Sequence, residues 1–204
     1  MPISFTIDLS DEDIARLSQA ARSDAHAADK ASIETATTAA SKLIEEAGKG
    51  KLPPFVSDRL EKLDRMIAMV RDEGWAMADA DLQHVLAALS YFVDPHDMIA
   101  DDTPVLGYLD DAIMIEIFAR DLAPELTAYD EFCAFRHDEA LQRGLDPAKV
   151  GRAEWLAERR EELHDRMHRW RDRDYGEGYG NSSGYKSKTT YVGNAWRPSL
   201  FRTT

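Results

Sequence analysis

Residues 91–111 read YFVDPHDMIADDTPVLGYLDD, and this stretch decides how the chain folds. It holds two prolines, one glycine and six aspartates between segments that have helical, apolar patterns. Pro95 and Pro104 each interrupt a helix, because proline lacks the backbone N–H and clashes with the preceding turn. Gly107 permits a tight turn with positive φ. The stretch therefore predicts a shaped acidic loop between two helices, with Pro95, Pro104 and Gly107 as its structural signature.

The aspartates of this loop have two interpretations. Asp110 and Asp111 stand at the predicted start of the next helix, where free N–H groups and the helix dipole favour acidic side chains. Asp97 and Asp101 are four residues apart, so one helical turn places both on one face. Together with Asp110 and Asp111 they would offer hard oxygen ligands suited to Mg²⁺, Ca²⁺ or Mn²⁺. Helix caps and a divalent-cation site both stay open, and no other cofactor is expected.

The fixed positions of this loop follow the pattern YxxxPxDxIxDxxPxLGYLDD over residues 91–111. This pattern resembles the signature of the YkvA-like family, the domain of unknown function numbered 1232, whose usual form is approximately SPIDLIPDFIPVLGYLDD. The family domain corresponds to about residues 80–120. The preceding KLPPFVSDRLEKLDRMIAMVRDEGWAM (residues 51–77) resembles a longer subgroup and extends the resemblance to about residue 140. The resemblance implies a small helical domain with a fixed acidic loop, and it implies no established activity.

Three positions depart from that pattern. Ala100 stands where the family has a proline, and Asp102 and Thr103 stand where it has apolar residues. The loop of this chain is therefore expected to be more flexible and more polar than that of its relatives. Many members also carry an added apolar helix, which this chain lacks.

The remaining sequence predicts an all-α fold, a compact helical bundle of about six helices with an Asp/Pro/Gly-rich loop and an extended C-terminal tail. Apolar residues recur at three- and four-residue steps, the spacing of one helix face. The segment from about 108 to 122 is apolar on most sides, which predicts a central, buried helix. Within it, Glu116 marks an exposed edge or reaches a basic partner. The expected helical segments are 14–47, 57–73, 79–93, 108–122, 124–143 and 146–171.

The expected domain organisation has three parts. Residues 1–145 form the helical YkvA-like domain, residues 146–171 form a charged C-terminal helix, and residues 172–204 form a tail. Asp146-Pro147 predicts the start of the last helix, with a capping residue before a proline in the first turn. The tail holds four of the seven tyrosines and five of the eleven glycines.

Composition limits the partners. The chain of 204 residues has a net charge of −13, and an acidic protein repels phosphate backbones and anionic lipids. No window approaches 18 uncharged apolar residues, so stable membrane insertion is not expected. The single cysteine, Cys133, and the absence of a leader pattern favour a reducing, cytoplasmic location.

The C-terminal region carries the strongest sign of an interaction surface. Seven arginines lie between residues 152 and 173, and arginine and tryptophan are enriched at interface hot spots. We therefore expect partner contacts from the aromatic residues of this region: Trp155, Trp170, Tyr175, Tyr179, Tyr185, Tyr191 and Trp196.

No complete catalytic set is visible. The chain lacks a Walker A loop, GxGxxG, CxxC and GxSxG patterns. Cys133 and His137 lack a third orienting group, so Cys133 is expected to be a buried small hydrophobe. His164 and His168 border an apolar stripe, which favours helix packing over zinc binding. The leading prediction is a non-enzymatic cytoplasmic accessory or regulatory protein that binds a protein partner or forms a homo-oligomer.

Two alternatives to this function stay open. The first is a divalent-metal-binding module or metal-dependent hydrolase that uses Asp97, Asp101, Asp110 and Asp111. The second is a toxin-neutralising or defence-system component, and the acidity of the chain is the one feature that favours it.

Overall fold

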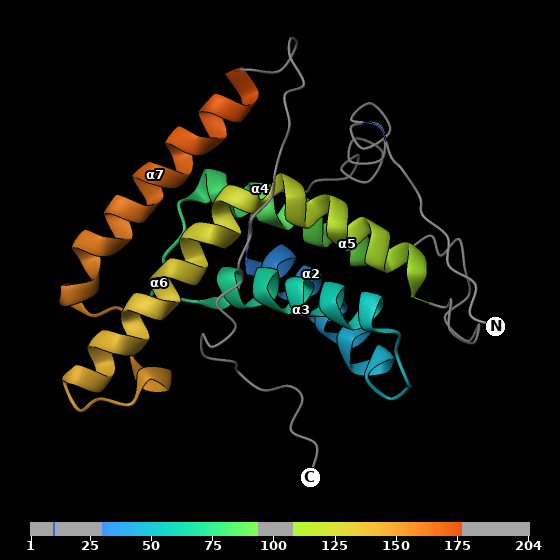
Figure 1. The fold of residues 1–204 in the computed structure, drawn as a ribbon, viewed down its shortest axis with the longest axis horizontal. Coiled ribbons are helices and arrows are strands. Elements are labelled where there is room, and N and C mark those ends of the chain that lie inside the picture. The colour runs from blue at the N-terminus through green and yellow to red at the C-terminus, as the bar shows by residue number, and fades with distance from the viewer. Residues whose placement is uncertain (1–9, 11–29, 94–107, 177–204) are drawn as a thin grey trace. The chain divides into compact units, whose positions relative to one another are not determined.

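The structure, a computed structural model, describes residue 10, residues 30–93 and residues 108–176. This part of the chain contains six α-helices and no strand, which confirms the all-α prediction (Figure 1). The chain divides into two compact units. The first unit comprises residues 1–70 and 78–121, and the second comprises residues 71–77 and 122–204. The domain limits expected from the sequence stay predictions.

In the described residues of the first unit there are four helices and a short 3₁₀ turn. Their order is α2 (Lys30–Ala47), α3 (Pro54–Arg71), α4 (Asp79–Leu89), η1 (Ser90–Val93) and α5 (Leu109–Asp121). The second helix begins at Pro54, earlier than the expected Ser57, because a proline fits the first turn of a helix. Helix α2 packs against α4 and η1. None of the helices in the described ranges is long and apolar enough to cross a bilayer.

Helix α5 supplies much of the core of this unit. Six of its apolar side chains are buried: Ala112, Met114, Ile115, Ile117, Phe118 and Ala119. The Phe118 ring lies edge-on to Tyr91 and Phe92, with ring centroids 5.8 and 6.3 Å apart. The prediction of a buried helix over about 108–122 is therefore confirmed.

Glu116 is the polar exception on α5. It accepts a hydrogen bond from Lys62 Nζ at 2.5 Å and lies 3.1 Å from Arg59 Nε, both on α3. Burial alone would raise the pKa of Glu116, but Lys62, Arg59 and Arg120 together hold it below its ordinary value. Of the two roles expected for Glu116, contact with basic residues is thus the observed one, and it ties α5 to α3.

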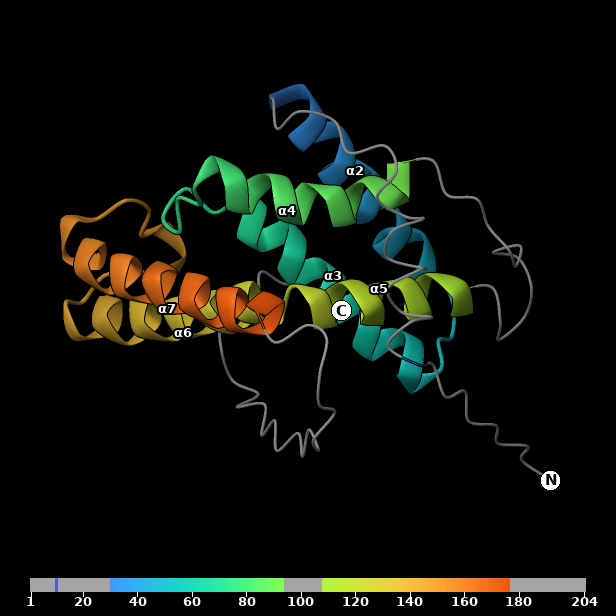
Figure 2. The ribbon, with the colours of Figure 1, turned by 90° about the horizontal axis from the view of Figure 1, so that it is seen from above.

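The second unit is built on two helices, α6 (Ala123–Gln142) and α7 (Ala157–Gly176), which lie side by side (Figures 1 and 2). Helix α6 ends where Gly144 takes a φ of +68°, which favours glycine. The Leu145 N–H donates to the Ala140 carbonyl at 2.8 Å, and the Gly144 N–H donates to the Leu141 carbonyl at 3.0 Å. This Schellman arrangement satisfies the last carbonyls of α6 and turns the chain.

The last helix begins later than expected. Asp146-Pro147 starts only a 3₁₀ turn, η2 (Pro147–Lys149), and α7 begins at Ala157 after a second turn, η3 (Glu154–Leu156). Between them, Gly151 has a low helix propensity, and Ala153 is extended with φ −88° and ψ 142°. The prediction of a helix from residue 146 is therefore wrong at its start. Its end also differs, because α7 continues to Gly176.

Substituting Phe118→Ala should destabilise the first unit by about 3–5 kcal/mol, because the side chain is fully buried and its removal leaves a cavity. Chemical unfolding followed by far-ultraviolet circular dichroism measures this. Phe55→Ala is the matched control: Phe55 is 40% exposed and should cost less than about 1 kcal/mol. Equal losses for both variants would contradict the assignment of Phe118 to the core.

Candidate functional site

The second unit contains a buried polar cluster centred on Asp72. This residue follows the end of α3 and opens the turn 72–77. Its Oδ1 accepts hydrogen bonds from the Gly74 N–H at 2.8 Å and the Trp75 N–H at 3.3 Å. Aspartates fold such turns because the short side chain reaches the backbone two residues on. Ala76 has a φ of +48°, a strained conformation for a residue with a Cβ, so the turn is held by its contacts.

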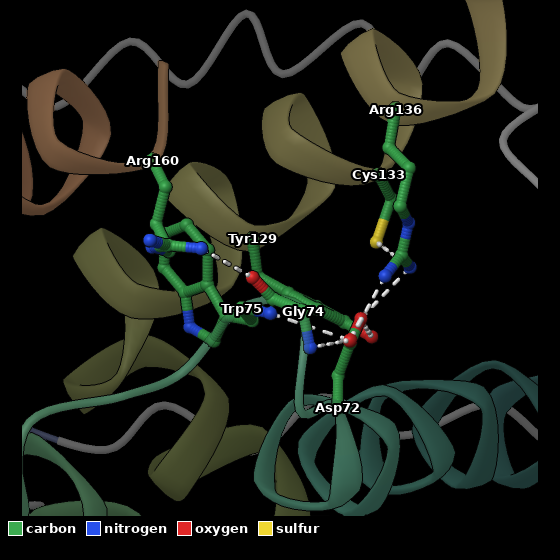
Figure 3. Close-up of polar contacts among 7 residues, drawn as sticks. All are labelled: Asp72, Gly74, Trp75, Tyr129, Cys133, Arg136 and Arg160. Atoms are coloured by element: carbon green, nitrogen blue, oxygen red, sulfur yellow. Dashed lines mark hydrogen bonds and ion pairs between the residues drawn. The ribbon is translucent and has the colours of Figure 1, made fainter. Parts of the chain in front are cut away.

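Arg136 on α6 binds the same carboxylate in a fork (Figure 3). Its Nη1 lies 2.8 Å from Asp72 Oδ1, and its Nη2 lies 2.8 Å from Oδ2. The Tyr129 hydroxyl, about two helical turns earlier on α6, also donates to Oδ2 at 3.0 Å. The side chains of Asp72 and Arg136 are only 11% and 8% exposed, so this pair is shielded from water. Together, these bonds fasten the turn 72–77 to α6.

Gly74 is required in this turn because the space around it is filled. A Cβ on Gly74 would lie 3.0 Å from Arg136 Nη1, Asp72 Oδ1 and the Gly151 carbonyl oxygen. The Gly74 carbonyl also accepts a hydrogen bond from Arg160 Nη1 on α7 at 3.2 Å. The turn is thus clasped between α6 and α7.

Trp75 fills the space between these elements and is fully buried. Its ring lies 5.1 Å from Phe132, 5.9 Å from Tyr129 and 4.2 Å from His164, centroid to centroid. Within the described residues, its Nε1 has no hydrogen-bond partner. The edge-on contact of His164 supports the prediction that this histidine packs against the helix rather than binding zinc.

The environment of the cluster keeps its ionisable groups in fixed states. Burial raises the pKa of the Cys133 thiol to about 11, although the Arg136 guanidinium acts in the opposite direction. Burial, with Cys133 and Asp72 nearby, also raises the pKa of the Tyr129 phenol. Burial would lower the pKa of Arg136, but its bonds to Asp72 raise it. Cys133 is therefore a protonated, buried thiol, as the sequence predicted, and a poor nucleophile.

The cluster is consequently a structural lock. A reactive thiol needs a depressed pKa and access to solvent, and Cys133 has neither. The sequence patterns predicted only a helix that ends at residue 73, and this cluster was not predicted. The signal was the DEGW segment directly after a predicted helix, since aspartate two residues before glycine is typical of a turn.

The arginines of α7 face mainly inward. Arg166 lies 2.6 Å and Arg159 3.4 Å from Glu131 on α6, and Arg171 lies 3.0 Å from the fully buried Glu125. Leu163 and Met167 are buried on the same side. This face of α7 therefore attaches the helix to α6, and four of the seven arginines that indicated an interface bind within the second unit.

The opposite face of α7 is exposed. Its residues recur at three- and four-residue steps, which places them within one stripe along the helix. We call this the acidic stripe; it consists of Glu158, Glu161, Glu162, Asp165 and Asp172, with Arg169 and Arg173 on either side of Asp172 near the C-terminal end.

An open pocket of about 420 Å³ lies in the connection between α6 and α7. Trp155 forms one wall and is itself covered by the Arg143 guanidinium, 4.4 Å above its ring. Leu145 on another wall is 45% exposed, and Leu141, four residues earlier, is 57% exposed. We call this the connection pocket; its lining comprises Leu145, Asp146, Lys149, Val150, Gly151, Arg152, Ala153 and Trp155.

The residues predicted to bind metal are only partly described. Asp110 and Asp111 are buried in the first turn of α5, a position that suits helix capping. Asp97 and Asp101, with Pro95, Pro104 and Gly107, lie outside the described residues. Among the residues that the structure describes, no group of three or more metal-binding side chains comes together. The cation site stays a prediction.

Two of the predicted partner-binding residues are described in full. Trp155 lines the connection pocket, and Trp170 is half-buried on α7. The Tyr175 side chain, Tyr179, Tyr185, Tyr191 and Trp196 lie outside the described residues. The predicted interaction surface stays a prediction, and the exposed Leu141 and Leu145 were not among its residues.

Comparison with known proteins identifies one segment. Residues 84–117 match the model of a protein family of unknown function, DUF1232. This match covers the end of α4, η1, the acidic loop and most of α5, so this segment of the first unit carries the DUF1232 signature and the family prediction is confirmed. No curated protein and no solved structure matches the chain. The YkvA-like subgroup stays a prediction.

Substituting Arg136→Met should destabilise the second unit by about 3–5 kcal/mol, because it leaves the Asp72 carboxylate buried without its counter-charge. Trp75, Trp155 and Trp170 all belong to this unit, so tryptophan fluorescence in a urea titration reports its unfolding. Lys149→Met is the control. It breaks the exposed pair with Asp146 and should cost less than about 1 kcal/mol. If Arg136→Met lowered the unfolding free energy by less than about 1 kcal/mol, the buried ion pair would not be what stabilises the turn 72–77.

The stability of the second unit should fall as pH rises from about 9 to about 11. In this window the unfolded chain loses the Cys133 proton while the folded protein keeps it, so unfolding is favoured. Urea titrations at several pH values should show that the difference in unfolding free energy between wild type and Cys133→Ala narrows with rising pH. A difference that does not change with pH would show that Cys133 titrates normally when folded.

Proposed function

We propose that this protein is a non-enzymatic accessory or regulatory protein of the cytoplasm. It acts by binding another protein, or a second copy of itself, through α7 and the chain that follows it. The binding surface comprises the acidic stripe and the aromatic residues Tyr179, Tyr185, Tyr191 and Trp196. The division of α7 into two faces carries this proposal.

One face of α7 is used inside the second unit and the other is exposed. Arg159, Arg166 and Arg171 hold the helix on α6, so their charges are already paired. The acidic stripe makes up the outward face of the helix, directly before the tyrosine-rich tail. Charged stripes give specificity and rapid association, and aromatic side chains supply most of the binding energy.

The chemistry of the lock also favours binding over catalysis. Asp72, Tyr129 and Arg136 bind one another, and the Cys133 thiol stays protonated at neutral pH. These groups hold the helix pair in place, which is what a docking surface requires.

Deleting residues 177–204 should reduce association at least tenfold, because it removes the aromatic residues while α7 ends at Gly176 and stays intact. Sedimentation velocity of the purified protein measures self-association. Association with another protein is measured by capturing that protein on immobilised full-length and truncated protein. The captured protein is then purified, and its binding to both forms is measured by titration.

The matched control keeps the length and charge of the tail. A full-length variant with Tyr179, Tyr185, Tyr191 and Trp196 changed to serine should lose association like the truncated protein. Circular dichroism should show that both variants keep the helices of the described ranges. Association that survives both changes would refute the proposed binding surface.

A further inference from the structure

We infer that the connection pocket anchors the chain's own tail, with residues 186–190 lying back along the acidic stripe and the Tyr191 side chain seated beside Trp155. This inference rests on the proposed function: the docked tail covers the acidic stripe and holds Tyr191 in the pocket, so a partner must displace it in order to bind. The inference is carried by the pocket, the reach of the tail and the matching charges of the two surfaces.

The connection pocket is large enough to hold an aromatic side chain together with the residues beside it. Its volume of about 420 Å³ falls within the usual range for binding pockets. Trp155 offers an aromatic wall, and the Arg143 guanidinium lies 4.4 Å from the centre of its ring. Leu145 and Leu141 expose apolar surface at the same connection. When another side chain covers apolar surface this exposed, the free energy of the protein falls.

The tail is long enough to reach the pocket. The part of the tail beyond α7 begins after Gly176, whereas the pocket lies at the other end of α7, next to Trp155. A helix of 20 residues is about 30 Å long. Residues 177–190 extend up to about 45 Å, so Tyr191 can return to the pocket without strain. A tethered segment also has a high effective concentration, which favours docking within one chain over docking between two.

The charges along this path are complementary. Residues 177–204 contain Lys186, Lys188, Arg197 and Arg202 against a single acidic residue, Glu177. With Tyr191 in the pocket, the two lysines fall three and five residues before it, beside the N-terminal half of α7. That half carries Glu158 and Glu161 of the acidic stripe, beside Glu162, which already pairs with Arg159 at 2.6 Å. Opposite charges at this spacing fix the direction in which the tail runs.

Photo-cross-linking of the full-length protein tests this inference. Tyr191 is replaced by benzoylphenylalanine, the protein is irradiated at about 1 µM, and the products are mapped by mass spectrometry. We expect cross-links to residues 141–155 within a single chain. Their yield should fall at least fivefold in 1 M NaCl, where the Debye length is about 3 Å.

A matched pair of substitutions provides the control. Val150→Asp in the pocket lining should reduce the cross-link yield at least fivefold, whereas Val93→Asp, at an exposed position of the first unit, should leave it unchanged. Both variants should keep the circular dichroism spectrum of the wild type. Cross-links that join two chains, that fall elsewhere in the same chain, or that do not form would each overturn the inference.

The two proposals fail separately. If deletion of residues 177–204 abolishes association but position 191 never cross-links to the pocket, the anchoring of the tail is wrong and the proposed function stands. If the cross-link forms and association survives the deletion, the pocket binds the tail but the tail does not bind the partner.

Discussion

The buried pair of Asp72 and Arg136 organises the second unit. A carboxylate loses its hydration when it is buried, and only several good bonds offset that cost. Asp72 receives them from two backbone N–H groups, a guanidinium fork and the Tyr129 hydroxyl. Because these donors come from the turn and from α6, satisfying one carboxylate fixes both elements. Trp75 then contacts Tyr129 and Phe132 of α6 on one side and His164 of α7 on the other, so its ring joins the two helices.

Most of the fold was predictable because apolar periodicity and chain-breaking residues are local signals. The buried α5, the end of α6 at Gly144 and the segments of α3 and α4 all follow from such patterns. The start of the last helix was not predictable in this way. Asp146-Pro147 has the right residues for a helix start, but the chain continues through Val150 and Gly151 into an extended Ala153. A cap starts a helix only when the next residues sustain it.

The candidate site was harder to predict because its parts are far apart in sequence. Asp72 and Arg136 are separated by 64 positions, and nothing local in either segment indicates the other. The arginines of α7 illustrate a second difficulty. Their number indicated an interface, and several of them do form one, but with Glu125 and Glu131 of the same unit. Residue type identifies an interface-forming face without identifying its partner.

Gly144 has a consequence that reaches beyond the end of α6. Its positive φ reverses the chain and directs Leu145 outward, and Leu145 is a wall of the connection pocket. The same residue thus ends a helix and shapes a surface. A residue with a side chain at this position would strain the turn and displace the Leu145 wall at the same time. The end of α6 and the shape of the pocket therefore depend on the same backbone torsion.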